Sequence, residues 1–178
     1  MELGMIGLGR MGGNMAKRLL ASGHRIVAYD QDSKAVAASV ADGAEGADSL
    51  GALVERLASP RIAWSMLPAG PPTEGTFQSL TTLLSPGDVI VDGGNCYYKD
   101  SMRRADASRQ KGLHYVDVGM SGGIAGLKEG YSLMVGGEEA VFKRLEPIFQ
   151  ALAPGPDRGY DYVGISGAGH FVKMVHNG

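Results

Sequence analysis

The chain has 178 residues, of which 44 % are hydrophobic, and its 17 Lys and Arg against 19 Asp and Glu give a net charge of −2. This length fits one domain, or a domain and a fragment, and the hydrophobic content allows a real core. The balanced charge argues against a protein whose main task is to neutralise nucleic-acid phosphates. No apolar run reaches the roughly 18–20 residues of a membrane span, and the single cysteine, Cys96, excludes an internal disulfide and a cysteine-rich metal site.

Short aliphatic runs alternate with helical patterns along the chain, which is typical of βαβ units around a parallel sheet. In chain order, strands are predicted at residues 3–7, 25–29, 61–66, 88–91, 114–118, 132–135 and 159–163. Helices are predicted at residues 11–22, 33–42 (with Ser33 as the cap), 49–57, 73–84, 99–111 and 138–152, with a last one from Gly169. Residues 119–130 are glycine-rich and are expected to form a loop. We therefore expect an α/β fold with a doubly wound, mostly parallel sheet and helices on both faces.

The first predicted β–α turn carries a glycine pattern. Residues 7–12, Gly-Leu-Gly-Arg-Met-Gly, fit G-x-G-x-x-G between a strand and a helix. The glycines of this pattern permit a tight turn, the approach of a pyrophosphate and close helix packing, and the helix N-terminus offers N–H groups to phosphates. The sequence therefore predicts a Rossmann-like dinucleotide site. The alternative is a glycine turn without a ligand.

The second predicted strand ends at Asp30, the place where an acidic residue accepts hydrogen bonds from the adenosine ribose. A carboxylate there repels a 2′-phosphate, and Gln31, not an arginine, follows it. We therefore expect NAD as the cofactor, with NADP less favoured.

Three further motifs follow predicted strands or begin the last helix. Residues 92–95 (Asp-Gly-Gly-Asn) and 119–123 (Gly-Met-Ser-Gly-Gly) each follow a strand, at the edge where open α/β sheets bind ligands. Either could be an ordinary glycine turn. In the block 167–178, Gly-Ala-Gly-His-Phe-Val-Lys-Met-Val-His-Asn-Gly, Lys173 and Asn177 share one helix face. The alternative there is an amphipathic helix whose lysine reaches water.

Taken together, these four motifs resemble those of the 6-phosphogluconate dehydrogenase family, in the same order and over residues 1–178. The twelve-residue block at the end is the most specific part of the match. Residues 97–100 (Tyr-Tyr-Lys-Asp) and the acidic end of the second strand look like the shorter, often NAD-linked branch. The resemblance implies oxidative decarboxylation of 6-phosphogluconate to ribulose 5-phosphate and CO2, with hydride transfer to NAD, in the pentose phosphate pathway.

Two alternatives to this function stay open. One is a β-hydroxyacid dehydrogenase of the 3-hydroxyisobutyrate type, since those enzymes share the fingerprint, the Ser-Gly-Gly turn and the helix lysine. The other is a non-catalytic module that only binds NAD.

The resemblance also implies roles for individual residues. Lys173 would be the general base for the C3 hydroxyl and would later stabilise the enolate oxygen, with Asn177 as the second catalytic residue. Residues that would hold the substrate are Asn95, Ser121, Gly122, Gly123 and His176. Residues that would hold the cofactor are Gly7, Leu8, Gly9, Arg10, Met11, Gly12, Asp30, Met66, Leu67, Pro68 and Asn95. No metal is expected.

The resemblance finally implies a division of the chain. Residues 1–166 would form the dinucleotide-binding domain, and residues 167–178 would begin a helix leading to a C-terminal helical domain that carries an acidic glutamate and most of the dimer interface. We therefore expect the 178-residue chain to bind the cofactor with little or no turnover, and the full-length enzyme to be a homo-oligomer. We expect a cytoplasmic location and no nucleic-acid or membrane partner. Cys96 occupies a position where the family has serine, as a small replacement or an oxidisable thiol.

Overall fold

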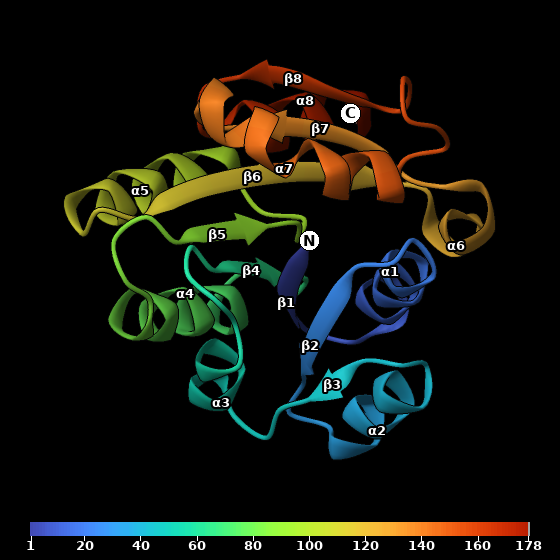
Figure 1. Ribbon diagram of the computed structural model, residues 1–178. Coiled ribbons are helices and arrows are strands. Elements are labelled where there is room, and N and C mark those ends of the chain that lie inside the picture. The colour runs from blue at the N-terminus through green and yellow to red at the C-terminus, as the bar shows by residue number, and fades with distance from the viewer. Residues whose placement is uncertain (178) are drawn as a thin grey trace.

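A single eight-stranded sheet forms the centre of the computed structural model, which describes residues 1–177 (Figure 1). The strands are β1 (Glu2–Ile6), β2 (Arg25–Tyr29), β3 (Glu45–Gly46), β4 (Ile62–Ser65), β5 (Val89–Asp92), β6 (His114–Ser121), β7 (Ser132–Gly136) and β8 (Tyr160–Gly164). The helices are α1 (Arg10–Ala21), α2 (Ser33–Ala41), α3 (Leu50–Glu55), α4 (Pro71–Leu83), α5 (Tyr98–Gln110), the 3₁₀ turn η1 (Gly123–Ala125), α6 (Gly126–Glu129), α7 (Glu139–Leu152) and α8 (Ala168–Asn177).

The strand order is β3-β2-β1-β4-β5-β6-β7-β8, and β1 to β6 are all parallel. The order reverses between β1 and β4, which is the switch point where such sheets bind ligands at their carboxyl edge. β7 runs antiparallel to β6, and β8 runs parallel to β7. The predicted Rossmann-like, mostly parallel α/β fold is confirmed.

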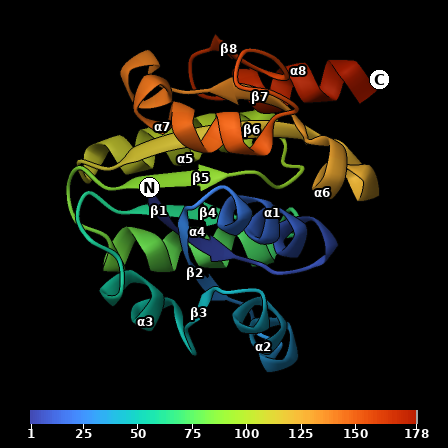
Figure 2. The same ribbon diagram turned by 45° about the vertical axis from the view of Figure 1, so that its right-hand side comes forward.

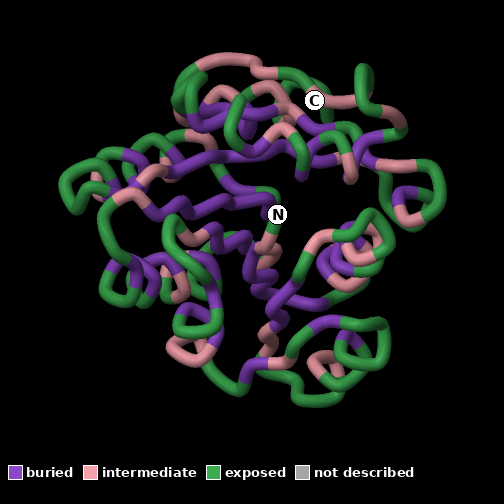
Figure 3. Tube along the Cα trace, viewed as in Figure 1, coloured by how far each residue is buried: buried purple, intermediate pink, exposed green. Residues whose placement is uncertain are grey.

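Helices cover both faces of the sheet, as Figure 2 shows from a second side. One apolar core joins the strands to α1 and α7, and a second core joins the opposite face to α3, α4 and α5. Buried segments run through the middle of the tube in Figure 3, along the strands. No helix within residues 1–177 has the length and apolar character needed to cross a membrane.

The structure corrects several local predictions. The strand predicted to end at residue 118 continues to Ser121, because β7 pairs with residues 117–121 and holds them extended. The rest of the expected loop forms η1 and α6. The two-residue strand β3 has no predicted counterpart. The cap of α2 is Asp32, not Ser33, since the Asp32 carboxylate accepts from the Lys34 amide at 2.9 Å.

Candidate functional site

The turn between β1 and α1 is built around its glycines. Gly7 has a φ of +90°, and a side chain there would collide with the Met66 carbonyl; a side chain at Gly12 would collide with the Gly7 carbonyl. Gly9 is different, because a Cβ there would meet nothing within 4 Å. No side chain caps the N-terminus of α1. The helix therefore presents free N–H groups and the positive end of its dipole to an open surface, as an anion site requires.

Asp30 has a structural part in this turn that the sequence did not predict. One carboxylate oxygen, Oδ2, accepts a hydrogen bond from the Leu8 amide at 2.7 Å, and Oδ1 accepts from the Asp32 amide at 2.8 Å. The residue predicted to contact the ribose thus also holds the glycine loop in place.

A cavity of about 270 Å³ lies at the carboxyl edge of the sheet, beside this turn. It brings together α1, the segments after β4 and β5, the end of β6 and the middle of α8. Its lining is Met11, Met66, Leu67, Pro68, Ala69, Gly93, Gly94, Asn95, Met120 and Lys173. Residues predicted for the cofactor, the substrate and the base therefore meet in one hollow, although they come from four separate motifs.

The segment after β5, which carries Asn95, is held in place by buried polar groups. Asp92 Oδ1 accepts from the Gly94 amide at 3.0 Å, and Asp92 Oδ2 accepts from the Tyr115 hydroxyl at 3.1 Å. Burial raises the pKa of Tyr115 well above its ordinary value, so the phenol keeps its proton and stays a donor. Arg104, which is 3 % exposed, lies 3.8 Å from the same carboxylate.

Arg104 connects this buried group to α4. Its Nε donates to Glu74 Oε1 at 3.0 Å, and Arg103 donates to the same oxygen at 2.8 Å. Arg103 first, with Gln78 and Arg104, lowers the pKa of Glu74 to about 2. Sequence reasoning missed these residues, because an arginine in the strongly polar α5 gives no signal that it faces inward. The only available hint was Asp92 itself, a carboxylate at the end of an aliphatic strand.

The Ser-Gly-Gly turn leaves the same edge of the sheet at the end of β6. The ring of Tyr131 lies directly beneath Gly122 and Gly126. Arg18 of α1 donates to the carbonyl oxygens of Leu127, at 3.2 Å, and of residues at the end of α7. Arg18 thus joins α1 to α6 and to the end of α7. The residues of the Ser-Gly-Gly turn do not line the cavity.

Lys173 is half-buried, whereas His176 and Asn177 are exposed on the last turn of α8. His176 and Asn177 lie outside the cavity lining, and Gly178 of the predicted block lies outside the described residues.

Cys96 is buried beside Thr73, and its burial raises the pKa of the thiol to about 12.

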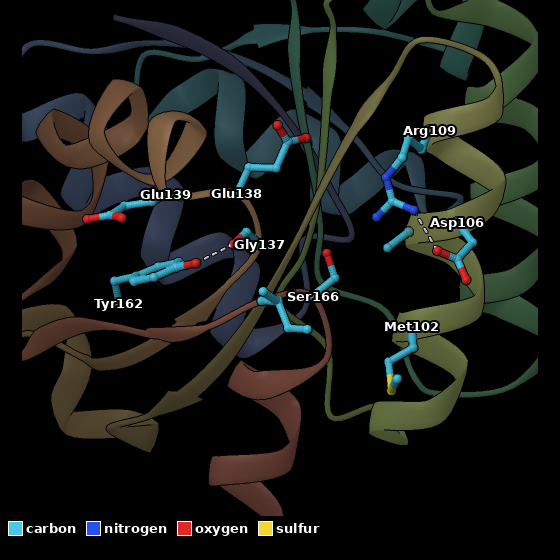
Figure 4. A pocket seen from close by; sticks show the side chains of 10 residues that line it. Met102, Asp106, Arg109, Gly137, Glu138, Glu139, Tyr162 and Ser166 are labelled. Atoms are coloured by element: carbon cyan, nitrogen blue, oxygen red, sulfur yellow. Dashed lines mark hydrogen bonds and ion pairs between the residues drawn. The ribbon is translucent and has the colours of Figure 1, made fainter.

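A separate cavity of about 380 Å³ lies at the opposite end of the sheet, where β6 begins. Figure 4 shows its lining, in which Arg109 pairs with Asp106 and the Tyr162 hydroxyl donates to the Gly137 carbonyl. None of its residues belongs to the predicted sites. Within residues 1–177, no group of three His, Cys, Asp or Glu side chains could hold a metal ion.

Comparison with known families gives a match over most of the chain. Residues 2–164 match the family described as the NAD binding domain of 6-phosphogluconate dehydrogenase. The chain belongs to this family. The predicted resemblance is thereby confirmed, and the glycine turn of α1 is part of an NAD-binding domain.

Curated relatives of this domain are longer than the chain. The NAD(+)-dependent, decarboxylating 6-phosphogluconate dehydrogenase of Haloferax volcanii is 49 % identical over 178 residues, which are 100 % of this chain and 58 % of the relative. The decarboxylating enzyme of Drosophila melanogaster is 42 % identical and is matched over 38 % of its length, with 99 % of this chain covered.

Solved structures share the fold. A 6-phosphogluconate dehydrogenase from Plasmodium falciparum superposes with a TM-score of 0.92 and 28 % identity, over 99 % of this chain and 40 % of that one. A 3-hydroxyisobutyrate dehydrogenase from Mycobacterium tuberculosis gives a TM-score of 0.90 at 24 % identity, over 99 % of this chain and 58 % of that one, a likeness of fold alone.

Proposed function

We propose that the protein to which this chain belongs oxidises and decarboxylates 6-phosphogluconate to ribulose 5-phosphate and CO2, with NAD as the hydride acceptor and NADP less favoured. The observation that carries this proposal is the cavity where Met11, Asn95 and Lys173 meet beside the glycine turn. The family supplies the reaction, and a cytoplasmic site of action and a homo-oligomeric full-length enzyme are parts of the same proposal.

The residues present fit a dinucleotide. The open space at Gly9, the uncapped N-terminus of α1 and the fixed carboxylate of Asp30 form a cradle for a pyrophosphate and a ribose. Gly7 to Gly12, with Asp30, would hold the phosphates and the adenosine ribose, while Met66, Leu67 and Pro68 would cover the nicotinamide half beside Asn95. When bound, NAD accepts a hydride from the substrate carbon.

Lys173 has the central chemical part in the proposal. Its neutral amine takes the proton of the substrate C3 hydroxyl as the hydride leaves C3, so that a C3 ketone forms. The bond from C2 to the carboxylate carbon then breaks, CO2 departs, and the electron pair passes to the former carbonyl oxygen. The protonated Lys173 stabilises this enolate oxygen. Asn95, Ser121 and the Gly122 and Gly123 backbone orient the substrate, with His176 and Asn177 completing the contacts.

Steady-state kinetics tests the substrate. The full-length protein that contains residues 1–178 is supplied with NAD and 6-phosphogluconate, and the absorbance of the reduced cofactor is followed. Turnover with 6-phosphogluconate and none with 3-hydroxyisobutyrate is the expected result. Turnover with 3-hydroxyisobutyrate alone would overturn the proposal, and binding of NADH without turnover of either acid would favour a non-catalytic module.

Cofactor preference needs a variant that leaves the glycine turn intact. Because Asp30 also holds the Leu8 amide, its replacement would change loop geometry and charge together. Gln31 is exposed and makes no such bond, so Gln31→Arg is the cleaner variant. NAD should bind the unmodified chain more tightly than NADP, and Gln31→Arg should strengthen NADP binding. Tighter NADP binding by the unmodified chain would contradict the assignment.

A further inference from the structure

Asp117 is a fully buried carboxylate in the middle of β6, between aliphatic neighbours. Its two oxygens bind the N-terminus of α8, a helix that begins 51 residues later in the chain. Oδ1 accepts a hydrogen bond from the Gly167 amide at 2.7 Å, and Oδ2 accepts from the His170 amide at 2.9 Å. A strand side chain thus caps the N-terminus of α8 from outside the helix.

Glycines allow α8 to lie directly on the strands that carry this carboxylate. A Cβ at Gly119 would lie 2.6 Å from Lys173 Cβ and 2.7 Å from the Gly169 carbonyl oxygen. A Cβ at Gly136 would lie 2.7 Å from the Gly169 amide. Any side chain at these positions would push the helix away from β6 and β7. The close approach fixes the distance of the helix from the sheet.

A side-chain hydrogen bond fixes the rotation of α8. His170 Nδ1 lies 2.6 Å from the Ser101 hydroxyl of α5, and His170 is 2 % exposed. His170 is therefore bound twice, through its amide to Asp117 and through its ring to Ser101. Lys173 follows three residues later, with its Cβ against Gly119 and its side chain at the cavity.

We propose that Asp117 is the positioning residue for Lys173: by capping α8 at Gly167 and His170, its carboxylate sets the depth and rotation at which the lysine enters the cavity. The inference rests on the proposed function in so far as Lys173 acts there as the base. Asp117 itself is fully buried, so it acts on the site through the helix and not by contact with a ligand.

A matched variant separates positioning from general stability. Asp88 is another buried carboxylate, 1 % exposed, that accepts from the amides of Arg61 and Ser85 at 2.7 and 2.8 Å and also pairs with the Arg61 guanidinium at 3.2 Å. It lies at the start of β5, at the end of the sheet away from the cavity. Both Asp117→Asn and Asp88→Asn remove a buried carboxylate that binds two backbone amides. Only Asp117→Asn would move Lys173.

Two measurements test the proposal. In the 178-residue chain, lysines are labelled as ¹³C-dimethyl amines, the Lys173 signal is assigned with Lys173→Arg, and its shift on addition of NADH is recorded by NMR. Asp117→Asn should reduce this shift to half or less while NADH affinity changes less than about twofold. In the full-length enzyme, the same variant should lower kcat about 10- to 100-fold, as expected for a misplaced reactive group, without raising the KM for NAD.

Asp88→Asn should leave both readouts unchanged even where it lowers Tm. Equal effects of the two variants, or a Lys173 signal that does not respond to NADH in the unmodified chain, would overturn the inference. If Asp117→Asn does not fold, Ser101→Ala is the second variant, because it removes the hydrogen bond to the His170 ring. Ser101→Ala should reduce the NADH-dependent shift of the Lys173 signal by a smaller amount. An unreduced shift in Ser101→Ala would also overturn the inference. Absence of turnover with 6-phosphogluconate would refute the proposed function alone, because the NADH-dependent shift does not depend on it.

Discussion

The two helices that meet at the cavity, α1 and α8, differ at their N-termini: one is uncapped and the other is capped. No side chain caps the N-terminus of α1, and Gly9 faces open space. The N-terminus of α8 is filled by the buried carboxylate of Asp117, which binds the amides of Gly167 and His170. An open N-terminus can bind an anionic ligand, whereas a filled one can only hold its own helix. In the proposed function, the first helix thus offers its N-terminus to the cofactor, and the second offers one side, with Lys173.

The largest expected effect lies on the side of α8. Lys173→Met in the full-length enzyme should lower kcat roughly 100- to 10,000-fold, the usual contribution of a general base, while NADH binding changes little. Stopped-flow and steady-state assays measure the two quantities. Lys143→Met, at an exposed position of α7, is the control. A fall in kcat of only a few-fold would favour the alternative of an amphipathic helix whose lysine reaches water.

Paired glycine variants sharpen the contrast between the two helices. Gly9→Ala should leave thermal stability nearly unchanged, because its methyl group meets nothing within 4 Å, yet it should weaken NADH binding at least tenfold by blocking the phosphates. Gly119→Ala should instead destabilise the fold by about 1–3 kcal/mol, because its methyl group meets Lys173 and Gly169. Calorimetry and NADH titration by quenching of Trp64 give both values. A stability loss in Gly9→Ala would contradict the assignment of an open ligand surface.

Thermal unfolding at decreasing pH tests the polar links behind Asn95, which run from Asp92 through Arg104 to Glu74. The folded-state pKa of Glu74 is about 2, against an ordinary 4.5, so its ionised form stabilises the fold above pH 4.5. This stabilisation is lost as the pH falls from 4.5 towards 2. Glu74→Gln should therefore lower stability at neutral pH, by less than about 1 kcal/mol because the pair with Arg103 is open to water. The difference in Tm should vanish at low pH.

Asp106→Asn, which removes a carboxylate from an exposed pair with Arg109 outside these links, is the control variant. A Tm difference between Glu74→Gln and the unmodified chain that stays constant from neutral pH to pH 2 would exclude the link.

The smallest effect is expected at Cys96. Since the pKa of this buried thiol is about 12, the folded chain should resist alkylation by iodoacetamide at pH 8, and the guanidinium-unfolded chain should react fully. Mass spectrometry measures the modified fraction. Cys96→Ser should change NADH affinity less than about twofold. Rapid alkylation of the folded chain would restore the alternative of an oxidisable thiol at the edge of the site.

Much of the fold follows from local sequence. Alternating strands and helices gave the order of the elements, because buried parallel strands and amphipathic helices have distinct periodicities. The extension of β6 to Ser121 was not predictable in this way, since it depends on pairing with β7. The role of Gly119 was not predictable for a similar reason. It stands in a motif expected at the ligand-binding edge, and in the structure it permits the close packing of α8 on β6.

The candidate site was predictable where its residues form contiguous motifs. Met11, Asn95 and Lys173 were found because each stands in a recognisable run, and the structure places all three in one cavity. Asp117 was not found, because its partners at Gly167 and His170 lie about fifty residues away. The one signal was physical: a carboxylate within an aliphatic strand must be satisfied by some distant donor.

The reversal of direction at β7 affects how the reactivity of this scaffold can be altered. Because β7 and β8 run against the first six strands, α8 begins beside Asp117 and runs along β6 towards its carboxyl end. Its anchor on Asp117 consists of the backbone amides of Gly167 and His170, which lie six and three residues before Lys173. A substitution at position 173 can therefore exchange the side chain at the cavity and leave the hydrogen bonds between Asp117 and the helix in place. Different side chains can therefore be selected at position 173 while Asp117 continues to hold the helix.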